Sequence, residues 1–158
     1  SIDELAFEVQ IKILKEMTDF FNERSLKGST GIKKLQSLLT AWQAFAKEHP
    51  RHLKYIGFFD HYYRDRYPNE ELARRYKESL ENGREEIPLS ALLHEGKADG
   101  SMRPDLSVKE TAAAIFEMTI SLLQRFASRG EIIKQEHNIE WDPILNTVFE
   151  MVVNYVKK

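Results

Sequence analysis

The chain has 158 residues and a formal charge of −2, and 42% of its residues are hydrophobic and 30% charged. This length and composition predict one globular domain over residues 1–158 and exclude a disordered chain. A slightly acidic balance does not suit a nucleic-acid-binding surface, which is usually basic. The chain has no cysteine, so disulfides and thiolate chemistry are excluded and a cytoplasmic location is expected.

Apolar residues recur at three- and four-residue intervals through the first half, which is typical of amphipathic helices. The first predicted helix covers about 3–24. Thr30 is the expected N-cap of a second helix, which ends before Pro50 because a residue preceding proline avoids helical dihedrals. Pro50 then begins a third helix, to about residue 66, where its missing N–H costs no hydrogen bond.

In the second half, Asn69 is the expected cap of a fourth helix that continues to about residue 97 with a bend or break near Pro88. Ser107 and Glu110 have the spacing of a capping box at the start of the most apolar helix, about 108–129. Gly130 is its expected C-cap, and 142–143 begins the last helix. No run competes as a strand, so the prediction is an all-α domain of about six helices.

The helix at 108–129 has two apolar stripes instead of one. The first consists of Ala112, Ile115, Thr119, Leu122 and Phe126, and the second of Ala113, Phe116, Ile120, Leu123 and Ala127. A helix that is apolar over so much of its circumference is buried on more than one side. We therefore expect it to contact its own domain and something further, either more core or a partner chain.

The residue patterns of common catalytic and metal sites are missing. None of the five histidines follows an acidic residue by three positions, which excludes a carboxylate–histidine metal bundle. The glycines at 28–31 lack the lysine of a phosphate-binding loop, and no Gly-x-Ser-x-Gly elbow is present. We therefore expect no catalytic residue, no metal and no cofactor. No apolar run approaches the length of a membrane span, so no membrane association is expected.

The aromatic residues say more about function than the histidines and glycines do. The chain has nine Phe, six Tyr and two Trp, and five of these rings lie between Tyr55 and Tyr63. Filling a core explains any single ring. As a group, with tyrosine hydroxyls that need partners when buried, they favour a site for an apolar or aromatic small molecule.

Two stretches resemble a known family. The sequence G-S-M-R-P-D-L-S at Gly100–Ser107, leading into an alanine-rich helix, resembles the ligand-binding domain of TetR-family transcriptional regulators, in which a "G-x-hydrophobic-R-x-D" stretch precedes the penultimate helix. S-I-D-E-L at Ser1–Leu5 is similar to the family's junction with its DNA-binding domain, although Ile2 replaces the usual lysine. The helix-turn-helix itself is absent from these residues.

The resemblance implies a homodimer in which the last two helices of each subunit form a four-helix bundle. It also implies a repressor that binds operator DNA only through a helix-turn-helix domain missing from this chain. The candidate dimer interface is Ile115, Thr119, Leu122, Phe126, Leu145, Val148, Phe149 and Val152. Which stripe faces the partner stays open, and either choice leaves Phe116 and Leu123 buried.

The ligand-binding hypothesis assigns the effector to an enclosed cavity lined by aromatic and apolar side chains. Its candidate residues are Trp42, Phe45, Phe59, Tyr62, Tyr63, Tyr76, Phe116 and Ile120. Two alternatives stay open. One is a ligand-free helical dimerisation module whose aromatics are all core, and the other is a small α-helical enzyme that uses His61 or His94 as a base.

Overall fold

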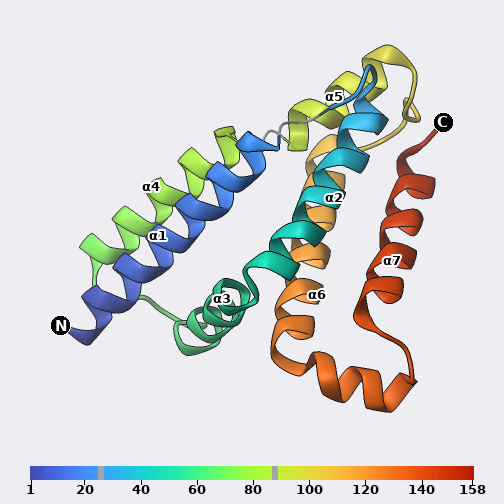
Figure 1. Cartoon of the computed structure of the whole chain (residues 1–158). Helices are drawn as coiled ribbons and strands as arrows, with labels where there is room; N and C mark the ends of the chain where they lie inside the picture. Colours follow the sequence, from blue (N-terminus) through green and yellow to red (C-terminus); the bar gives the residue numbers. More distant parts are fainter. Residues whose placement is uncertain (25–26, 87–88) are drawn as a thin grey trace.

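The computed structural model describes residues 1–24, 27–86 and 89–158, and these ranges contain seven α-helices and no β-strand (Figure 1). The helices are α1 (Ile2–Glu23), α2 (Gly31–Glu48), α3 (Pro50–Tyr62), α4 (Glu70–Glu86), α5 (Leu89–Asp99), α6 (Val108–His137) and α7 (Trp141–Val156). The predicted all-α fold is confirmed. The predicted fourth helix is two helices, α4 and α5, and the break expected at Pro88 lies outside the described residues.

The helix starts follow local capping chemistry. The Thr30 hydroxyl accepts a hydrogen bond from the backbone N–H of Lys33 at 3.4 Å, as expected for the N-cap of α2. The Asn69 side chain likewise accepts from the N–H of Leu72 at 2.9 Å and caps α4. Pro50 occupies the first turn of α3, where its missing donor is not needed. The N-terminal caps of α2 and α4 are therefore confirmed.

The sequence pattern placed the start of α6 correctly at Val108 but misplaced its end. Ser107 stands at its N-cap, but the hydroxyl makes no capping hydrogen bond, so the predicted capping box does not form. Gly130 does not end the helix, because the chain continues helically to His137. A bend replaces the predicted end, with non-helical dihedrals at Arg129 (φ −131°, ψ 16°). The helix ends at Asn138, which takes the left-handed conformation common after helix C-termini (φ 53°).

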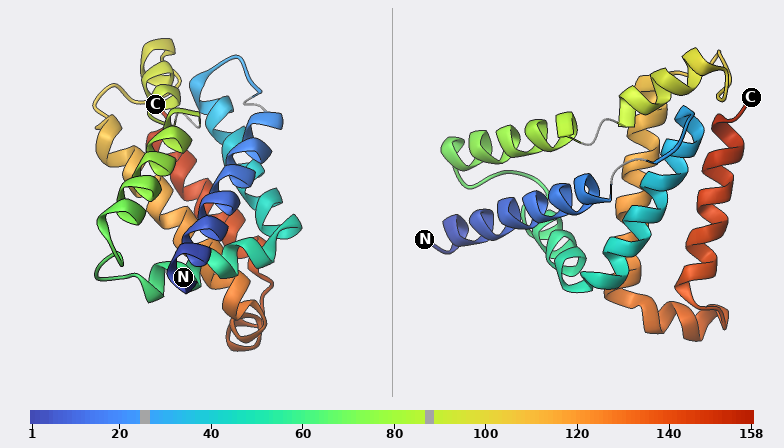
Figure 2. Two further views of the ribbon diagram at one scale, coloured as in Figure 1. Left: turned by 90° about the vertical axis from the view of Figure 1, so that its left-hand side faces the viewer. Right: turned by 45° about the horizontal axis from the view of Figure 1, so that its top comes forward.

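The helices form a bundle and an arm. Helices α2, α5, α6 and α7 enclose the main core, to which the second half of α1 adds Ile13, Met17, Phe20 and Phe21. Helices α1 and α4 lie side by side and project from the bundle, as two views agree (Figures 1 and 2). Helix α3 packs against α6 and α1 and so joins the two parts. A second, small core lies where α3 meets the arm and consists of Phe7, Phe59, Leu72 and Tyr76. In the described residues, no helix is both long and apolar enough to cross a bilayer.

The stretch that resembles the TetR motif joins three helix ends. Met102 is fully buried, and its N–H donates to the Gly96 carbonyl in α5 at 2.9 Å. The N–H of Arg103 donates to the Val156 carbonyl at the end of α7, also at 2.9 Å. An isolated β-bridge joins Met102 to Lys157. The motif therefore holds α5 and α7 together where α6 begins.

Candidate ligand-binding cleft

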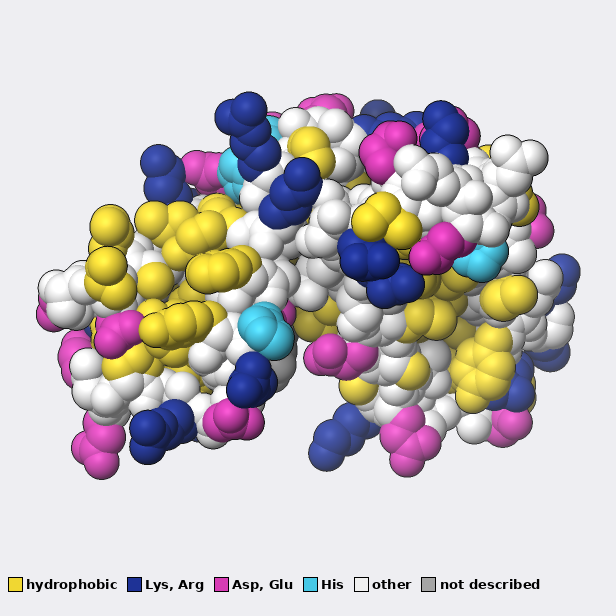
Figure 3. Space-filling model, turned by 90° about the horizontal axis from the view of Figure 1, so that it is seen from below, with side chains coloured by type: hydrophobic (Ala, Val, Ile, Leu, Met, Phe, Trp, Pro, Cys, Tyr) yellow, Lys and Arg dark blue, Asp and Glu magenta, His cyan; other side chains and the backbone are white. Residues whose placement is uncertain are grey.

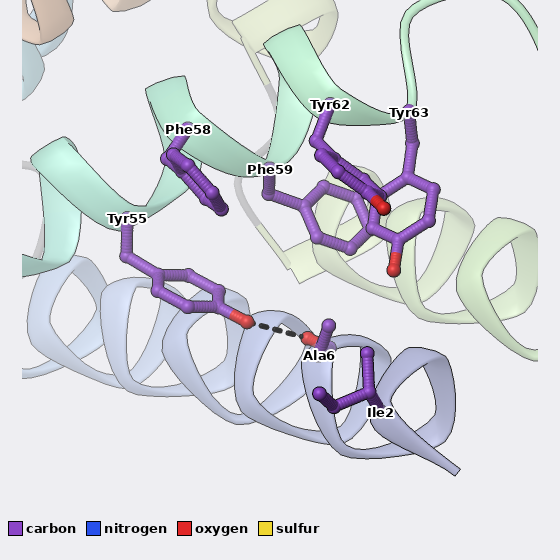
Figure 4. Close-up of a pocket in the computed structure, with 7 residues that line it drawn as sticks. All are labelled: Ile2, Ala6, Tyr55, Phe58, Phe59, Tyr62 and Tyr63. Carbon is purple, nitrogen blue, oxygen red and sulfur yellow. Dashed lines mark hydrogen bonds between the residues drawn. The ribbon is translucent and has the colours of Figure 1, made fainter.

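A cleft of about 200 Å³ lies between the first turns of α1 and the second half of α3 (Figure 4). Aromatic rings form most of its lining, with two small or aliphatic side chains from α1. The lining residues are Ile2, Ala6, Tyr55, Phe58, Phe59, Tyr62 and Tyr63.

Helical periodicity gathers these side chains. Residues 55, 58, 59 and 62 follow the i, i+3, i+4, i+7 spacing that places side chains on one face of a helix. Tyr63, the C-cap residue of α3, adds a fifth ring beside them. On α1, residues 2 and 6 are four apart and share a face. Figure 4 shows the five rings extending from α3 toward α1.

Two tyrosine hydroxyls fix the inner rings to α1. Tyr55 donates a hydrogen bond to the backbone carbonyl of Ala6 at 2.9 Å, and Tyr63 donates to the Asp3 carboxylate at 2.6 Å. Burial raises the pKa of Tyr55. Burial, and then the hydrogen bond to Asp3, raise the pKa of Tyr63 well above its usual range. Both phenols are therefore neutral at physiological pH, and their protons are already engaged.

The inner wall of the cleft is densely packed. The buried ring of Phe7 lies edge-on to Phe59 at 4.9 Å and to Tyr63 at 4.8 Å between ring centroids. Behind them, burial raises the pKa of Tyr76 to about 12. The outer wall differs, because Phe58 and Tyr62 are 66% and 65% exposed.

Seen from below, apolar side chains gather over the end of the molecule where α1 and α3 lie (Figure 3). Exposed large apolar side chains at this end include Ile2, Leu5, Phe58 and Tyr62. Contiguous exposed apolar surface of this kind marks ligand or partner sites more often than isolated residues do. The cleft therefore opens onto an apolar surface.

The predicted ligand-binding residues fall into two separate groups. Phe59, Tyr62 and Tyr63 line the cleft, and Tyr76 packs behind Phe59 at 5.3 Å. Trp42, Phe45, Phe116 and Ile120 instead belong to the main core or pack at its edge, and Trp42 contacts Phe116 at 6.1 Å. The lining of the cleft includes none of these four residues, so the cleft does not join Trp42 to Tyr62. Within this single chain Leu123 is buried and Phe116 is 37% exposed, so the expected burial of Phe116, which includes a dimer partner, stays a prediction.

Sequence reasoning omitted four lining residues from its candidates. These are Ile2, Ala6, Tyr55 and Phe58. The spacing of residues 55, 58, 59 and 62 was a usable signal for two of them. The contribution of α1 depends on how α3 folds back against it, and no local pattern reports that packing.

The predicted interface residues are mostly buried inside the chain itself. Ile115, Thr119 and Phe126 on α6 face the main core, as do Leu145, Phe149 and Val152 on α7. Leu122 and Val148 are half-buried and accessible. On α7, a different apolar stripe faces outward at helical spacing, consisting of Ile144, Val148, Met151 and Tyr155. Met151 and Tyr155 in this stripe are 64% and 56% exposed.

A second hollow, of about 430 Å³, lies at the bend of α6 beside the start of α7. Its lining is mixed, with Lys54 and Arg129 alongside Glu131 and Glu140. The Trp141 ring stacks on Phe126 at 5.7 Å. This hollow lacks the aromatic concentration of the cleft.

The two histidines considered as possible bases, His61 and His94, lie outside both hollows. His52 pairs with Glu16 across α3 and α1. His61 and His94 are exposed. Within the described ranges, no group of three or more potential metal ligands comes together.

Comparison with known proteins bears on the fold. No family model matches the sequence, and no curated protein matches it. The structure is similar to that of the ketosteroid transcriptional regulator KstR2 of Mycobacterium tuberculosis, with a TM-score of 0.73 and 14% sequence identity. The alignment covers 100% of this chain and 74% of that one. The chain therefore shares its fold with that regulator.

The stretch at Gly100–Ser107 has a defined place in this fold. That motif lies where a helix pair, α6 and α7, is joined to the rest of the bundle. The solved structure is of a transcriptional regulator and not of an enzyme. At 14% identity the similarity describes the fold, and the chemistry of the cleft comes from this chain's own residues.

Proposed function

We propose that this chain is the effector-binding and dimerisation domain of a TetR-like transcriptional repressor. The observation that carries the proposal is the similarity to the KstR2 fold along the whole chain. Operator DNA is bound through a helix-turn-helix domain outside these residues. The net charge of −2 agrees with that division, because the segment has no excess of basic residues for a DNA backbone.

The effector site is the aromatic cleft between α1 and α3. Its lining is apolar except for tyrosine hydroxyls, which suits a small molecule with an apolar or aromatic body. Phe59 and Tyr63 provide a firm inner wall, and Phe58 and Tyr62 provide an exposed outer wall that a ligand covers. Binding therefore buries ring surface that is now in contact with water.

The dimer surface is the outward face of α6 and α7. The α7 stripe at residues 144, 148, 151 and 155 spans about three helical turns, and Met118 and Leu122 add accessible apolar surface on α6. A twofold axis brings the same stripe of each subunit together, so each apolar residue is buried twice. This assignment keeps Leu122 and Val148 and replaces the predicted residues that face the chain's own core.

The regulatory mechanism is a population shift. An effector between α1 and α3 favours one separation of these helices, and α1 begins beside the cleft at Ile2. The ligand shifts the equilibrium only by its difference in affinity for the two states, typically about 1–3 kcal/mol. In a dimer, that shift changes the spacing of the two DNA-binding domains.

Sedimentation velocity tests the dimer assignment. The chain is expected to sediment as a dimer at micromolar concentration, and Met151→Asp is expected to yield a folded monomer because a charge cannot be buried unpaired at the interface. Asn154→Asp is the matched control, since Asn154 is exposed on the same helix outside the stripe. Equal dimerisation of both variants would refute the assignment.

Fluorescence titration tests the effector site. The neutral dye N-phenyl-1-naphthylamine gains fluorescence in apolar surroundings, and we expect it to bind the wild type. Tyr62→Ala is expected to weaken dye binding about tenfold by removing an outer ring. His61→Ala, at the preceding position, is expected to leave dye binding unchanged. Identical affinities for the two variants would place the effector elsewhere.

A ligand-free dimerisation module is the second candidate. The cleft, at about 200 Å³, is smaller than the roughly 300–1,000 Å³ of most small-molecule sites. This candidate predicts a stable dimer that shows no saturable dye binding. The two measurements therefore separate the candidates, because only the regulator with an effector site shows both.

A further inference from the structure

The polar atoms that border the aromatic cleft are electron-rich. The hydroxyl protons of Tyr55 and Tyr63 are donated to Ala6 and Asp3, so these two oxygens present only lone pairs to a ligand. The acceptor of the Tyr63 proton is itself a carboxylate. Because the pKa values of both tyrosines are raised, neither phenol becomes an anion at physiological pH. A ligand that only accepts hydrogen bonds gains little from either oxygen.

Aromatic faces add to this negative character. A ring carries a negative face and a positive edge, so cations are attracted to the face within about 6 Å of its centroid. Five of the seven lining residues are aromatic, and none is lysine or arginine. No lining side chain therefore offers a positive charge that would offset the rings.

The outer rings are arranged as adjoining walls. Phe58 and Tyr62 lie nearly parallel, with an interplanar angle of 19° and ring centroids 6.2 Å apart. Tyr63 stands across the Tyr62 ring at 77° and 4.9 Å. Figure 4 shows Tyr62 and Tyr63 extending from α3 on the same side as Phe58. Rings at two orientations around an open space, one of them hydrogen-bonded to the Asp3 carboxylate, are complementary to a small positive group.

We propose that the cleft selects a small monovalent organic cation, an ammonium group on an apolar or aromatic body. This inference rests on the proposed function, in which the cleft takes the effector, and it narrows the effector's chemical class. The ring faces, and the Asp3 carboxylate behind the Tyr63 hydroxyl, stabilise the positive charge, while Phe59 and Ala6 contact the apolar body. An anion of the same shape is repelled by Asp3 and by the ring faces.

Calorimetry with three molecules of one shape tests the charge preference. Benzyltrimethylammonium is the cation, neopentylbenzene its neutral isostere, and phenylmethanesulfonate an anion of similar size. With the wild-type dimer we expect the cation to bind about tenfold tighter than the neutral isostere, and the anion to show no measurable binding.

Variants locate the source of the preference. Tyr62→Leu keeps apolar bulk and removes the ring face, so it is expected to reduce the cation's advantage to about threefold or less while the neutral isostere binds as before. Asp3→Asn is expected to weaken binding of the cation and to leave binding of the neutral isostere unchanged. Asp19→Asn is the charge-matched control, because Asp19 lies on the same helix near its other end, paired with Lys15. Circular dichroism checks that each variant is folded.

The outcomes separate this inference from the proposed function. Equal binding of the cation and its neutral isostere overturns the charge preference and leaves the effector site standing. Binding of the anion alone overturns it as well. If none of the three molecules binds and the fluorescent dye fails too, the cleft is not an effector site and both proposals fall together.

Discussion

The carboxylate of Asp99, at the end of α5, accepts a hydrogen bond from the backbone N–H of Gly31, the first residue of α2, at 2.7 Å. Its other oxygen accepts from the N–H of Ser101 at 2.8 Å, and the Ser101 hydroxyl accepts from the N–H of Ile32 at 3.3 Å. Residues far along the chain thus satisfy donors that the first turn of α2 leaves free. The contact stabilises the junction from which α6 starts.

Acid is expected to weaken this junction. Hydrogen bonding by the Ser101 side chain, then by the N–H of Gly31, lowers the pKa of Asp99 below its ordinary value of 3.8. Since folding favours the ionised form, the stabilisation is complete above pH 3.8 and is lost as the pH falls through the lower folded-state pKa. Urea unfolding of wild type and Asp99→Asn should therefore differ at pH 7 and converge near pH 2. A constant difference across that range would contradict the assignment, and Asp65→Asn is the exposed control.

The contact between Gly31 and Gly96 leaves no room for a side chain. A Cβ on Gly31 would overlap the backbone of Gly96 and lie 2.7 Å from the Leu92 carbonyl oxygen. Gly31→Ala is therefore expected to lower the free energy of unfolding by about 1–3 kcal/mol, because backbone atoms cannot move aside cheaply. Thermal and urea unfolding measure the loss.

Gly57→Ala is the matched control for that variant. Its Cβ would meet the Gln124 side chain at 3.6 Å, an ordinary contact. Within α3, alanine removes backbone freedom from the unfolded chain, so a gain of about 0.5–1 kcal/mol is expected. If both alanine variants shifted stability in the same direction, the close approach of α2 and α5 would be in doubt.

Alkali is expected to weaken the arm formed by α1 and α4. Burial raises the pKa of Tyr76 from 10.0 to about 12, so folding favours the neutral phenol. This stabilisation is present below pH 10 and is lost as the pH rises through about 12. Absorbance at 295 nm should show late tyrosine titration, from which Tyr76→Phe should remove the step near pH 12 while the later step of Tyr63 stays. Removal of the late step by Tyr62→Phe instead would contradict the assignment.

Local sequence chemistry determined where most helices begin. Thr30, Pro50 and Asn69 each act on groups within a few residues, through a side-chain cap or a fixed proline dihedral. The all-α fold followed for the same reason, since helical periodicity is a local property. Two local signals failed: the Ser107 hydroxyl makes no capping hydrogen bond at the N-cap of α6, and Gly130 does not end that helix. Past Gly130, α6 continues helically to His137 and buries only Ile133 in this part.

Only the tertiary structure decided which apolar faces are core, cleft or outer surface. The two stripes of α6 look equivalent in the sequence, yet Thr119 is buried and Phe116 is partly exposed. The aromatic residues, which were treated as one group in the sequence analysis, are divided between two cores. Trp42 lies in the main core and Phe59 in the small core where α3 meets the arm. A side chain is buried only if a helix from elsewhere in the chain packs against the face that carries it. Helical periodicity therefore predicts how wide the apolar face of a helix is. The packing between helices, such as that of α1 against α3 and α4, determines whether that face is buried in a core, lines the cleft or stays exposed.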